Sequence, residues 1–188
     1  MIKRERHSAW HWLRKLPLIA VLRVMVPLYR VITGHPPRRY SEVLPSLWVG
    51  GQHYRHGIPK MRKQGITAIV NLRTYPDDAA MNRITERYLW LPTTDHTPPT
   101  LADIQRAVDF IDAEIANGGK VYVHCRAGVG RGPTMTACYL VSKNYTPHEA
   151  WEAIRRVRPF IYPTTSQLLQ VESYYHSLQE TTPAFETD

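Results

Sequence analysis

The sequence predicts an α/β fold in which a central sheet is covered by helices on its faces. Short apolar runs that are typical of strands alternate with segments of helical periodicity, and no internal repeat is evident. The expected strands are Leu47–Gly50, Ala68–Leu72, Tyr88–Pro92 and Lys120–His124. With 188 residues, 43% of them hydrophobic, the chain is long enough to build one domain with its own core.

The helices between these strands are indicated by their first residues and by their periodicity. Thr100–Asp103 forms a capping box, after which apolar residues recur at helical spacing until Gly118 and Gly119 end the pattern. Thr146–Glu149 opens a second helix, with proline in its first turn. A third helix is expected over Pro133–Lys143, directly after the strand and glycine-rich loop described below.

Charge divides the chain into a basic arm and a neutral body. Residues 1–39 hold nine Lys or Arg and one acidic residue, Glu5, which accounts for the whole net charge of +8. The rest of the chain carries fifteen residues of each sign. We therefore expect an arm and linker over 1–39, a globular domain over 40–180 and a tail over 181–188.

The arm is apolar but interrupted by charge. Its longest uncharged run, Leu16–Leu22, is only seven residues, whereas a bilayer-spanning helix needs about 20. One arc of about 120° on a helical wheel holds four basic positions, His11, Lys15, Arg23 and Arg30. The larger apolar residues lie mainly elsewhere, at Leu13, Leu16, Val24 and Leu28. This pattern favours an amphipathic helix that contacts a membrane surface through residues 10–32.

The sequence leaves the structure and the surroundings of the arm open. Pro17 and Pro27 are expected to kink or divide its helix. The arm could instead pack on the domain, or insert partly into a bilayer. A signal peptide is disfavoured because no small-residue cleavage site follows the apolar run.

The stretch HCRAGVGRGPT, residues 124–134, carries the clearest chemistry. Cys125 stands where a buried strand ends, and the glycine-rich loop after it can curl its amides around an anion above a helix N-terminus. Such a position lowers the pKa of a thiol. Arg131 returns to the same concavity with a planar fork suited to two phosphate oxygens. A nucleophilic thiolate inside a phosphate cradle predicts phosphoryl transfer.

Cys-x5-Arg preceded by His resembles the signature of the cysteine-dependent phosphatases, and HCRAG resembles their dual-specificity subgroup. The likeness covers residues 40–178 and includes LPSLWVGG, ITAIVNLR, TTDHTPPTLADI and IRRVRPFIYPTTSQL. Within this subgroup, the chain resembles the small phosphatases that are similar to phosphatidylglycerophosphate phosphatase. The resemblance implies a protein tyrosine phosphatase-like fold with a mixed central sheet flanked by helices.

The resemblance also implies catalytic roles. Cys125 would attack phosphorus and form a phosphocysteine, and Arg131 would bind the phosphoryl oxygens. Asp95 would protonate the leaving oxygen and then activate water, with Asp77 and Asp78 as alternatives for this acid. His124 is expected to orient the cysteine and its loop. The residues expected at the substrate are His124, Arg126, Ala127, Gly128, Val129 and Gly130.

Gly132 departs from the family pattern, which has Ser or Thr directly after the arginine. That hydroxyl stabilises the thiolate as the intermediate is hydrolysed, so its loss is expected to slow turnover more than the first chemical step. Thr134 could supply a substitute hydroxyl. Cys138 lies too far along the following helix for a disulfide with Cys125 and is expected in the core.

Three polar residues have open roles. Arg126 could meet a second anionic group of the substrate or remain a solvated charge. Arg73 could line the pocket or pair with an acid. Gln167 could position water, although the sequence favours a place on a helix surface.

These observations predict a cysteine-dependent phosphatase that acts on a phosphomonoester, with a phospholipid head group as the first candidate substrate. A phosphoprotein phosphatase tethered by its arm and a low-turnover phosphate-binding module are the alternatives. No cofactor or metal is expected. Nucleic acid is not expected either, because the arm is apolar rather than interleaved with polar residues. Two cysteines in a chain of this length indicate a reducing compartment, so we expect a cytoplasmic, membrane-associated protein.

Overall fold

A computed structural model describes residues 8–181 of the chain, with side chains described from residue 17 to residue 180. The strands are β1 (Glu42–Leu44), β2 (Leu47–Gly50), β3 (Ile66–Asn71), β4 (Arg87–Trp90) and β5 (Lys120–His124). The α-helices are α1 (Ser8–Thr33), α2 (Ile58–Lys63), α3 (Leu101–Ala116), α4 (Arg131–Val141), α5 (Pro147–Val157) and α6 (Thr165–Thr181). Short 3-10 helices occupy Arg38–Tyr40 and Arg55–Gly57.

Within the described residues the strands form one five-stranded mixed sheet in the order β1-β2-β5-β3-β4. β1 pairs with β2 antiparallel, and the other neighbours are parallel. β5 is the central strand, with Val123 opposite Val49 of β2 and Val70 of β3. The predicted α/β architecture with a mixed central sheet is therefore confirmed, and β2 and β5 have their predicted bounds.

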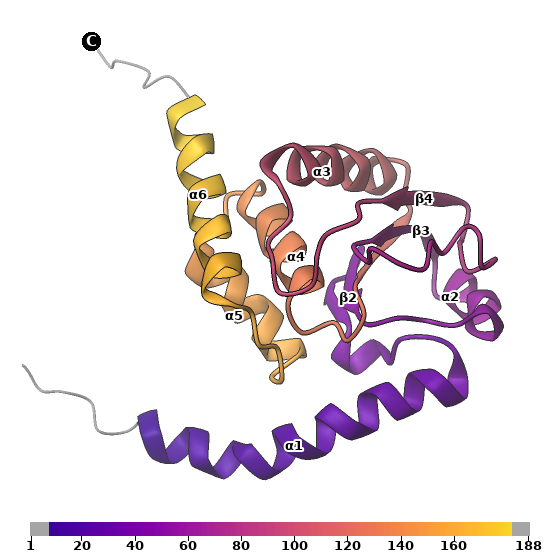
Figure 1. Cartoon of the computed structure of the whole chain (residues 1–188), viewed down its shortest axis with the longest axis horizontal. Coiled ribbons are helices and arrows are strands. Elements are labelled where there is room, and N and C mark those ends of the chain that lie inside the picture. Colours follow the sequence, from indigo (N-terminus) through magenta and orange to yellow (C-terminus); the bar gives the residue numbers. More distant parts are fainter. Residues whose placement is uncertain (1–7, 182–188) are drawn as a thin grey trace, which may run out of the picture.

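The two faces of the sheet carry separate cores because successive side chains of a strand point to opposite sides. Helices α3 to α6 cover the face that presents Val121 and Val123 of β5. Tyr122 points to the other face, where it packs with Trp48 and with residues of α2. Figure 1 shows α3, α4, α5 and α6 gathered on one side of the strands, with α2 apart from them. The carboxyl end of β5 thus lies at the centre of the fold.

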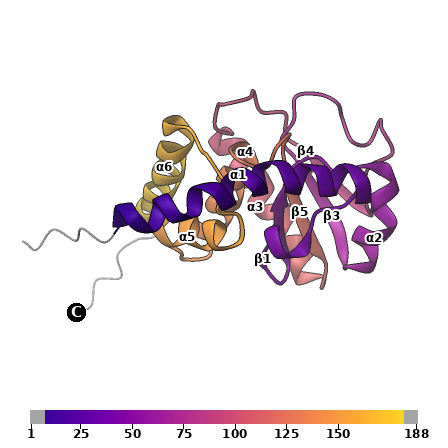
Figure 2. The same cartoon turned by 90° about the horizontal axis from the view of Figure 1, so that it is seen from below.

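The arm forms one long helix beside this body. α1 runs without interruption through Pro17 and Pro27, so the expectation that the prolines divide it is wrong. A proline inside a helix removes a single backbone hydrogen bond, and tertiary contacts can offset that loss. Figure 2 shows α1 extended across the body in front of the strands and α5.

The contacts of α1 with the body come from one stripe of its surface. Leu22 and Val26 are buried against Phe160, with Tyr40 and Val129 at the edge of the cluster. One turn further along, the buried guanidinium of Arg30 donates a hydrogen bond of 2.7 Å to the carbonyl oxygen of Gln52.

The helical wheel placed Arg30 on an exposed basic face of the arm, and this prediction is wrong because Arg30 faces the body. The apolar Val24 and Leu28 are exposed. Of the tail expected over 181–188, all but Thr181 lies outside the described residues.

Candidate active site

Cys125 follows the last residue of β5 and begins a tightly curled loop. Its side chain is buried, and the backbone N–H of Gly128 donates a hydrogen bond of 3.3 Å to its sulfur. Gly128 has φ +73°, and a Cβ at that position would lie 2.3 Å from the carbonyl carbon of Gly50. Glycine is therefore required here by backbone conformation and by space. The partial positive charge of this amide thus points at the sulfur.

Arg158, a residue that the sequence analysis did not single out, supports this loop from the core. It is fully buried at the end of α5, and its guanidinium donates to the carbonyl oxygens of Gly128 (2.9 Å), Ala127 (3.3 Å) and Tyr40 (2.6 Å). Burial lowers the pKa of Arg158 to about 10, which still leaves it charged at neutral pH. The loop carbonyls thus point toward a buried cation, which leaves the amides on the other side free for an anion.

Arg131 is the first residue of α4, and its guanidinium is held by three oxygens. One nitrogen, Nη1, donates to the carbonyl oxygens of Leu72 (3.2 Å) and Thr93 (2.7 Å). The other, Nη2, lies 3.0 Å from Oδ1 of Asp95. Its side chain is only 4% exposed, so the charge is fixed beside Cys125 rather than free to swing into solvent.

Asp95 stands on the long loop between β4 and α3, and its side chain is 56% exposed. This loop is tied to the start of α6. Thr164 donates to the carbonyl oxygen of His96, and Gln167 donates to that of Thr97, both at 3.0 Å. An exposed carboxylate next to the arginine and at the cleft is placed to exchange protons with a bound ester.

His124 lies under the cysteine and is fully buried. Its Nε2 is 2.7 Å from Oδ2 of Asp78, and its Nδ1 is 3.3 Å from the carbonyl oxygen of Cys125. Asp78 also accepts a hydrogen bond of 2.9 Å from Gln52 and lies 3.0 Å from Arg83. Burial alone would raise the pKa of Asp78, but the hydrogen bond and charge of His124 hold it at about 2. An ionised carboxylate therefore fixes the imidazole beneath the nucleophile.

His53, Asp78 and His124 are also the described residues whose possible ligand atoms lie within 4.8 Å of one another. Burial, and then the neighbouring His124, lower the pKa of His53 to about 3, so this imidazole is neutral. Asp78 already pairs with His124 and with the guanidinium of Arg83, which would repel a metal cation. The cluster therefore fits a buried hydrogen-bond network better than a metal site.

The geometry separates the three aspartates considered as general acid. Asp78 is fully buried, and Asp77 accepts a hydrogen bond of 2.6 Å from the hydroxyl of Tyr88. Neither lines the cleft, whereas Asp95 does. The assignment of Asp95 as the acid stays a prediction, and this geometry favours it.

A cleft of about 550 Å³ opens above Cys125. The loop that carries the Cys-x5-Arg pattern, residues 125–131, is called the signature loop below. It contributes Cys125, Arg126, Ala127, Val129, Gly130 and Arg131 to the walls of the cleft. Of the remaining residues expected at the substrate, Gly128 contacts the sulfur through its amide, and His124 lies beneath the loop. The cleft also takes in residues from outside the signature, including Arg23 of α1, Tyr162 and Gln167.

The sequence favoured a helix-surface position for Gln167, and this expectation is wrong. It is only 1% exposed, and a Cβ on Gly130 would lie 2.9 Å from its Oε1. It therefore packs against the signature loop and joins that loop to the one that carries Asp95. Arg73, whose role the sequence left open, donates a hydrogen bond of 2.5 Å to Gln52 and so belongs to the network around Asp78.

Of the α4 residues that the sequence analysis considered, Cys138 lies in the core as predicted, whereas Thr134 does not replace the missing hydroxyl. The hydroxyl of Thr134 donates to the carbonyl oxygen of Gly130 at 3.0 Å, so it is not directed at Cys125 as a substitute for the missing one. Cys138 is fully buried and unpaired, and burial raises the pKa of its thiol. A Cβ on Gly132 would lie 3.6 Å from the amide nitrogen of Cys125, which leaves room for a serine.

Comparison with known proteins places this site in a family. Residues 47–177 match the model of the dual specificity phosphatase catalytic domain. The chain belongs to the dual specificity phosphatase family. The matched segment contains Asp95, Cys125 and Arg131, whereas the whole of α1 lies outside it.

Relatives include both protein and lipid phosphatases. Dual specificity protein phosphatase 5 of Rattus norvegicus is 36% identical over 137 residues, which cover 70% of this chain and 35% of that protein. Phosphatidylglycerophosphate phosphatase PTPMT2 of Arabidopsis thaliana is 31% identical over 143 residues, covering 73% of this chain and 63% of that protein. The chain thus spans about a third of the first relative and less than two thirds of the second.

Solved structures show the same fold. The crystal structure of PTPMT1 superposes with a TM-score of 0.67 at 25% identity, covering 75% of this chain and 96% of that one. The structure of human DUSP28 superposes with a TM-score of 0.68 at 21% identity, covering 76% and 99%.

Proposed function

We propose that this protein hydrolyses a phosphomonoester through a phosphocysteine intermediate, and that the ester is the head group of a phospholipid at a membrane surface. The chemistry rests on the site. Cys125 would attack phosphorus while the bond to the leaving oxygen breaks and Asp95 gives that oxygen a proton. Water would then attack the phosphocysteine, losing its proton to Asp95 and releasing inorganic phosphate and the thiolate.

The loop amides and Arg131 supply the charge that this reaction needs. The loop carbonyls are drawn back toward Arg158, and the guanidinium of Arg131 is fixed by backbone oxygens before a substrate arrives. Donors that are already oriented stabilise the developing phosphoryl charge without reorganising during the reaction.

The lipid substrate is supported by the exposed face of α1, which is the observation that carries this proposal. Among residues 17–180, eight of the fourteen most exposed large hydrophobic side chains lie on this one helix. They are Leu18, Val21, Val24, Met25, Leu28, Tyr29, Val31 and Ile32. A contiguous apolar face of this kind marks an interaction site.

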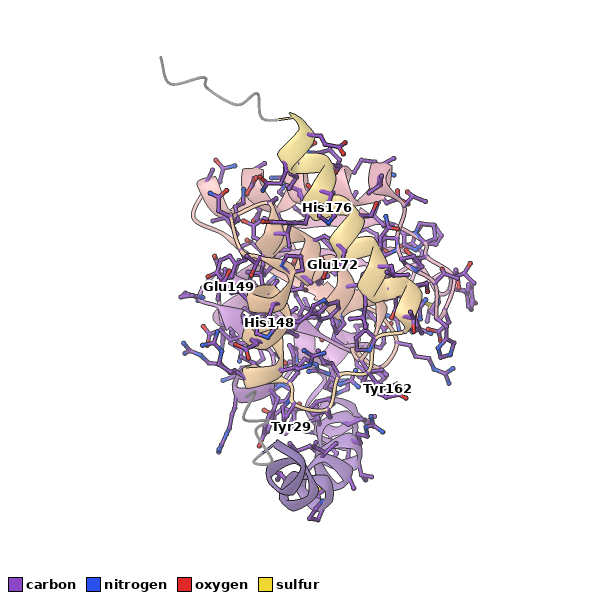
Figure 3. The ribbon with its side chains drawn as sticks, turned by 90° about the vertical axis from the view of Figure 1, so that its left-hand side faces the viewer. Tyr29, His148, Glu149, Tyr162, Glu172 and His176 are labelled. Atoms are coloured by element: carbon purple, nitrogen blue, oxygen red, sulfur yellow. The ribbon has the colours of Figure 1, made fainter. Side chains whose placement is uncertain are left out.

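A membrane surface matches both the charge and the position of α1. Residues 1–39 carry the whole net charge of the chain, and basic residues beside an apolar face favour an anionic membrane surface. Tyr162, which is 75% exposed, lies at the cleft beside Arg23 of α1. Figure 3 shows Tyr162 on the side of the body that faces α1. No helix in the described part of the chain is both long and apolar enough to cross a membrane.

Vesicle binding tests the membrane contact with a matched pair of variants. Val24 on α1 and Leu169 on α6 are apolar and similarly exposed, at 65% and 62%. Val24→Glu should weaken binding to anionic vesicles by about tenfold or more. It removes an apolar side chain that would be buried in the membrane, and it adds a negative charge that the anionic lipids repel. Leu169→Glu should leave binding unchanged. Equal losses in the two variants, or no binding by the wild type, would refute the membrane contact.

Phosphate release from a panel of substrates tests the reaction and its substrate. Vesicles that contain a phospholipid with a terminal phosphomonoester should be hydrolysed faster than phosphopeptides, and Cys125→Ser should abolish both activities. The identity of 36% to a protein phosphatase makes a phosphoprotein the second candidate substrate. Faster release from phosphopeptides, with no effect of vesicles, would establish that alternative instead.

A further inference from the structure

α1 contributes a charged side chain to the catalytic cleft, although the helix lies outside the segment shared with the family. Arg23 lines the cleft together with Arg126 and Tyr162. The family match begins only at residue 47, so Arg23 belongs to the part of the chain that the shared signature does not explain.

Arg23 is held in place from both sides along the helix. Leu22, the residue before it, and Val26, one turn later, are 6% and 3% exposed against Phe160. Beyond them the buried Arg30 donates to the carbonyl oxygen of Gln52, whose own N–H donates to the carbonyl oxygen of Arg126 at 2.9 Å. The backbone that carries Arg23 is thus connected to the signature loop rather than loosely apposed to it.

Tyr162 provides a platform for the guanidinium. The Cζ atom of Arg23 lies 5.8 Å from the centre of the Tyr162 ring, within the range of a cation–π contact. The backbone N–H of Tyr162 donates a hydrogen bond of 2.8 Å to the carbonyl oxygen of Val129 in the signature loop. The ring is therefore placed by the loop, and it leaves the edge of the guanidinium available for hydrogen bonds.

The charges around the cleft are unbalanced. Asp95 is the acidic residue in its lining, and it pairs with Arg131. Among residues 17–180, neither Arg23 nor Arg126 forms an ion pair with a carboxylate. When a phosphoryl group occupies the loop over Cys125, it is matched by Arg131 and the amides. Two arginines then remain without an anion.

We propose that Arg23 and Arg126 form a second anion subsite, which binds another phosphate group of the same substrate molecule. This inference rests on the proposed function, and it narrows the substrate to molecules that carry a second phosphate, such as a phosphodiester, in addition to the phosphomonoester that is hydrolysed. Arginine suits this role because its fork can bind two phosphate oxygens at once. The volume of the cleft exceeds what a single phosphate needs.

Kinetics with two soluble substrates test the subsite. One is a monoalkyl phosphate, and the other is a short-chain phospholipid, below its micelle concentration, with a phosphodiester and a terminal phosphomonoester. Wild type should have a KM for the second that is lower by about tenfold or more, as expected for charged hydrogen bonds. Arg23→Gln should raise that KM by about tenfold with little change in kcat, and should raise the KM of the alkyl phosphate much less.

Two further variants control for charge and folding. Lys60 is an exposed basic residue on α2 that does not line the cleft, and Lys60→Gln should leave both KM values unchanged. Arg23→Lys keeps the charge but loses the fork, so its KM for the two-phosphate substrate should fall between those of wild type and Arg23→Gln. Because Arg23 is exposed, thermal unfolding of these variants should match that of wild type.

Three results would overturn the subsite. The first is an equal rise of KM for both substrates in Arg23→Gln. The second is a rise of KM for the two-phosphate substrate in Lys60→Gln as large as that in Arg23→Gln. The third is an effect of Arg23→Gln that appears only when the substrate is presented in vesicles. The last would show that Arg23 binds the phosphate of a neighbouring lipid rather than of the substrate.

Binding separates this inference from the proposed function. The dissociation constant of the two-phosphate phospholipid, measured in a Cys125→Ser background with and without Arg23→Gln, needs no turnover. Suppose that the wild type releases no phosphate, and that Arg23→Gln weakens binding in the Cys125→Ser background. This result would uphold the subsite and refute the phosphatase activity. Equal dissociation constants, with normal turnover by the wild type, would refute the subsite alone.

Discussion

The signature loop with α4 and the helix α1 border the same cleft but are held in opposite ways. Every residue of α4 is buried, and the loop before it is fixed by Arg158 and by the amide of Gly128. α1 touches the body through one narrow stripe, and most of its described large apolar side chains are exposed. The first region is complete within the fold, whereas the second has an apolar face that the body does not cover.

This difference indicates a division of labour. A site for covalent chemistry needs donors that are already oriented, and burial supplies them. α1 supplies none of the groups that would react, and under the proposed function its exposed face would select where the protein works and on which substrate. The predictions below test which groups of the cleft and of its buried support carry the chemistry.

The largest expected effect is the loss of the general acid. Asp95→Asn should lower kcat for alkyl phosphates by about 100-fold or more, because their alkoxide leaving groups need a proton. Aryl phosphates need little protonation and should lose much less. Equal losses on both substrates would show that Asp95 does not protonate the leaving group, and the same comparison would then be made with Asp77→Asn.

The next effect concerns the carboxylate beneath His124. Asp78→Asn should destabilise the fold by about 3 kcal/mol, since it leaves the guanidinium of Arg83 without its counter-charge and removes the carboxylate that His124 contacts. The folded-state pKa of Asp78, about 2, lies below the value of about 3.9 for an unfolded chain. Its contribution to stability is therefore present above about pH 4 and lost as the pH falls through about 2.

Urea unfolding of both proteins across this pH range measures that contribution. The free energies of unfolding of wild type and Asp78→Asn should differ most near neutral pH and converge in acid. A difference that does not change with pH would mean that the pairing of Asp78 contributes nothing through its charge.

The smallest effect should come from Gly132, where the buried region departs from its family. Gly132→Ser should raise kcat about three- to tenfold if hydrolysis of the phosphocysteine limits turnover, as expected for one added hydrogen bond to the sulfur. The structure has room for the side chain. In stopped-flow experiments with an aryl phosphate, wild type should show a burst that shrinks in the variant. Without a burst in wild type, the missing hydroxyl does not limit turnover.

Sequence reasoning succeeded where local pattern and burial coincide. β5 has its predicted bounds because its apolar run, Val121–Val123, is buried in a central strand. Thr100 and Thr146 are the N-caps of α3 and α5, as predicted, because their hydrogen bonds are made within four residues. The full capping box forms at Thr146, whereas of its two hydrogen bonds Thr100 makes only the one from the backbone N–H of Asp103. Cys125, Arg131 and Asp95 meet at one cleft, as the signature implied.

What the sequence could not provide depends on contacts between distant segments. Asp78 was considered as an acid, but 45 residues of chain lie between it and His124, whose contact decides its role. Arg158 and Gln167 are polar residues that fold inward onto the signature loop, so neither has a periodic signal. The side of α1 that faces the body is set by Phe160 and Gln52, and a helical wheel holds no information about either.

Rapid-quench trapping of the intermediate tests the central claim, that the buried loop alone carries the covalent chemistry. Wild type is mixed with a phosphate-labelled aryl phosphate, quenched within the first turnover, digested and mapped. The account predicts label on the peptide that contains Cys125, none in Cys125→Ser, and an unchanged position of the label in Arg23→Gln. Label on another residue, or phosphate release by Cys125→Ser at a rate near that of wild type, would contradict it.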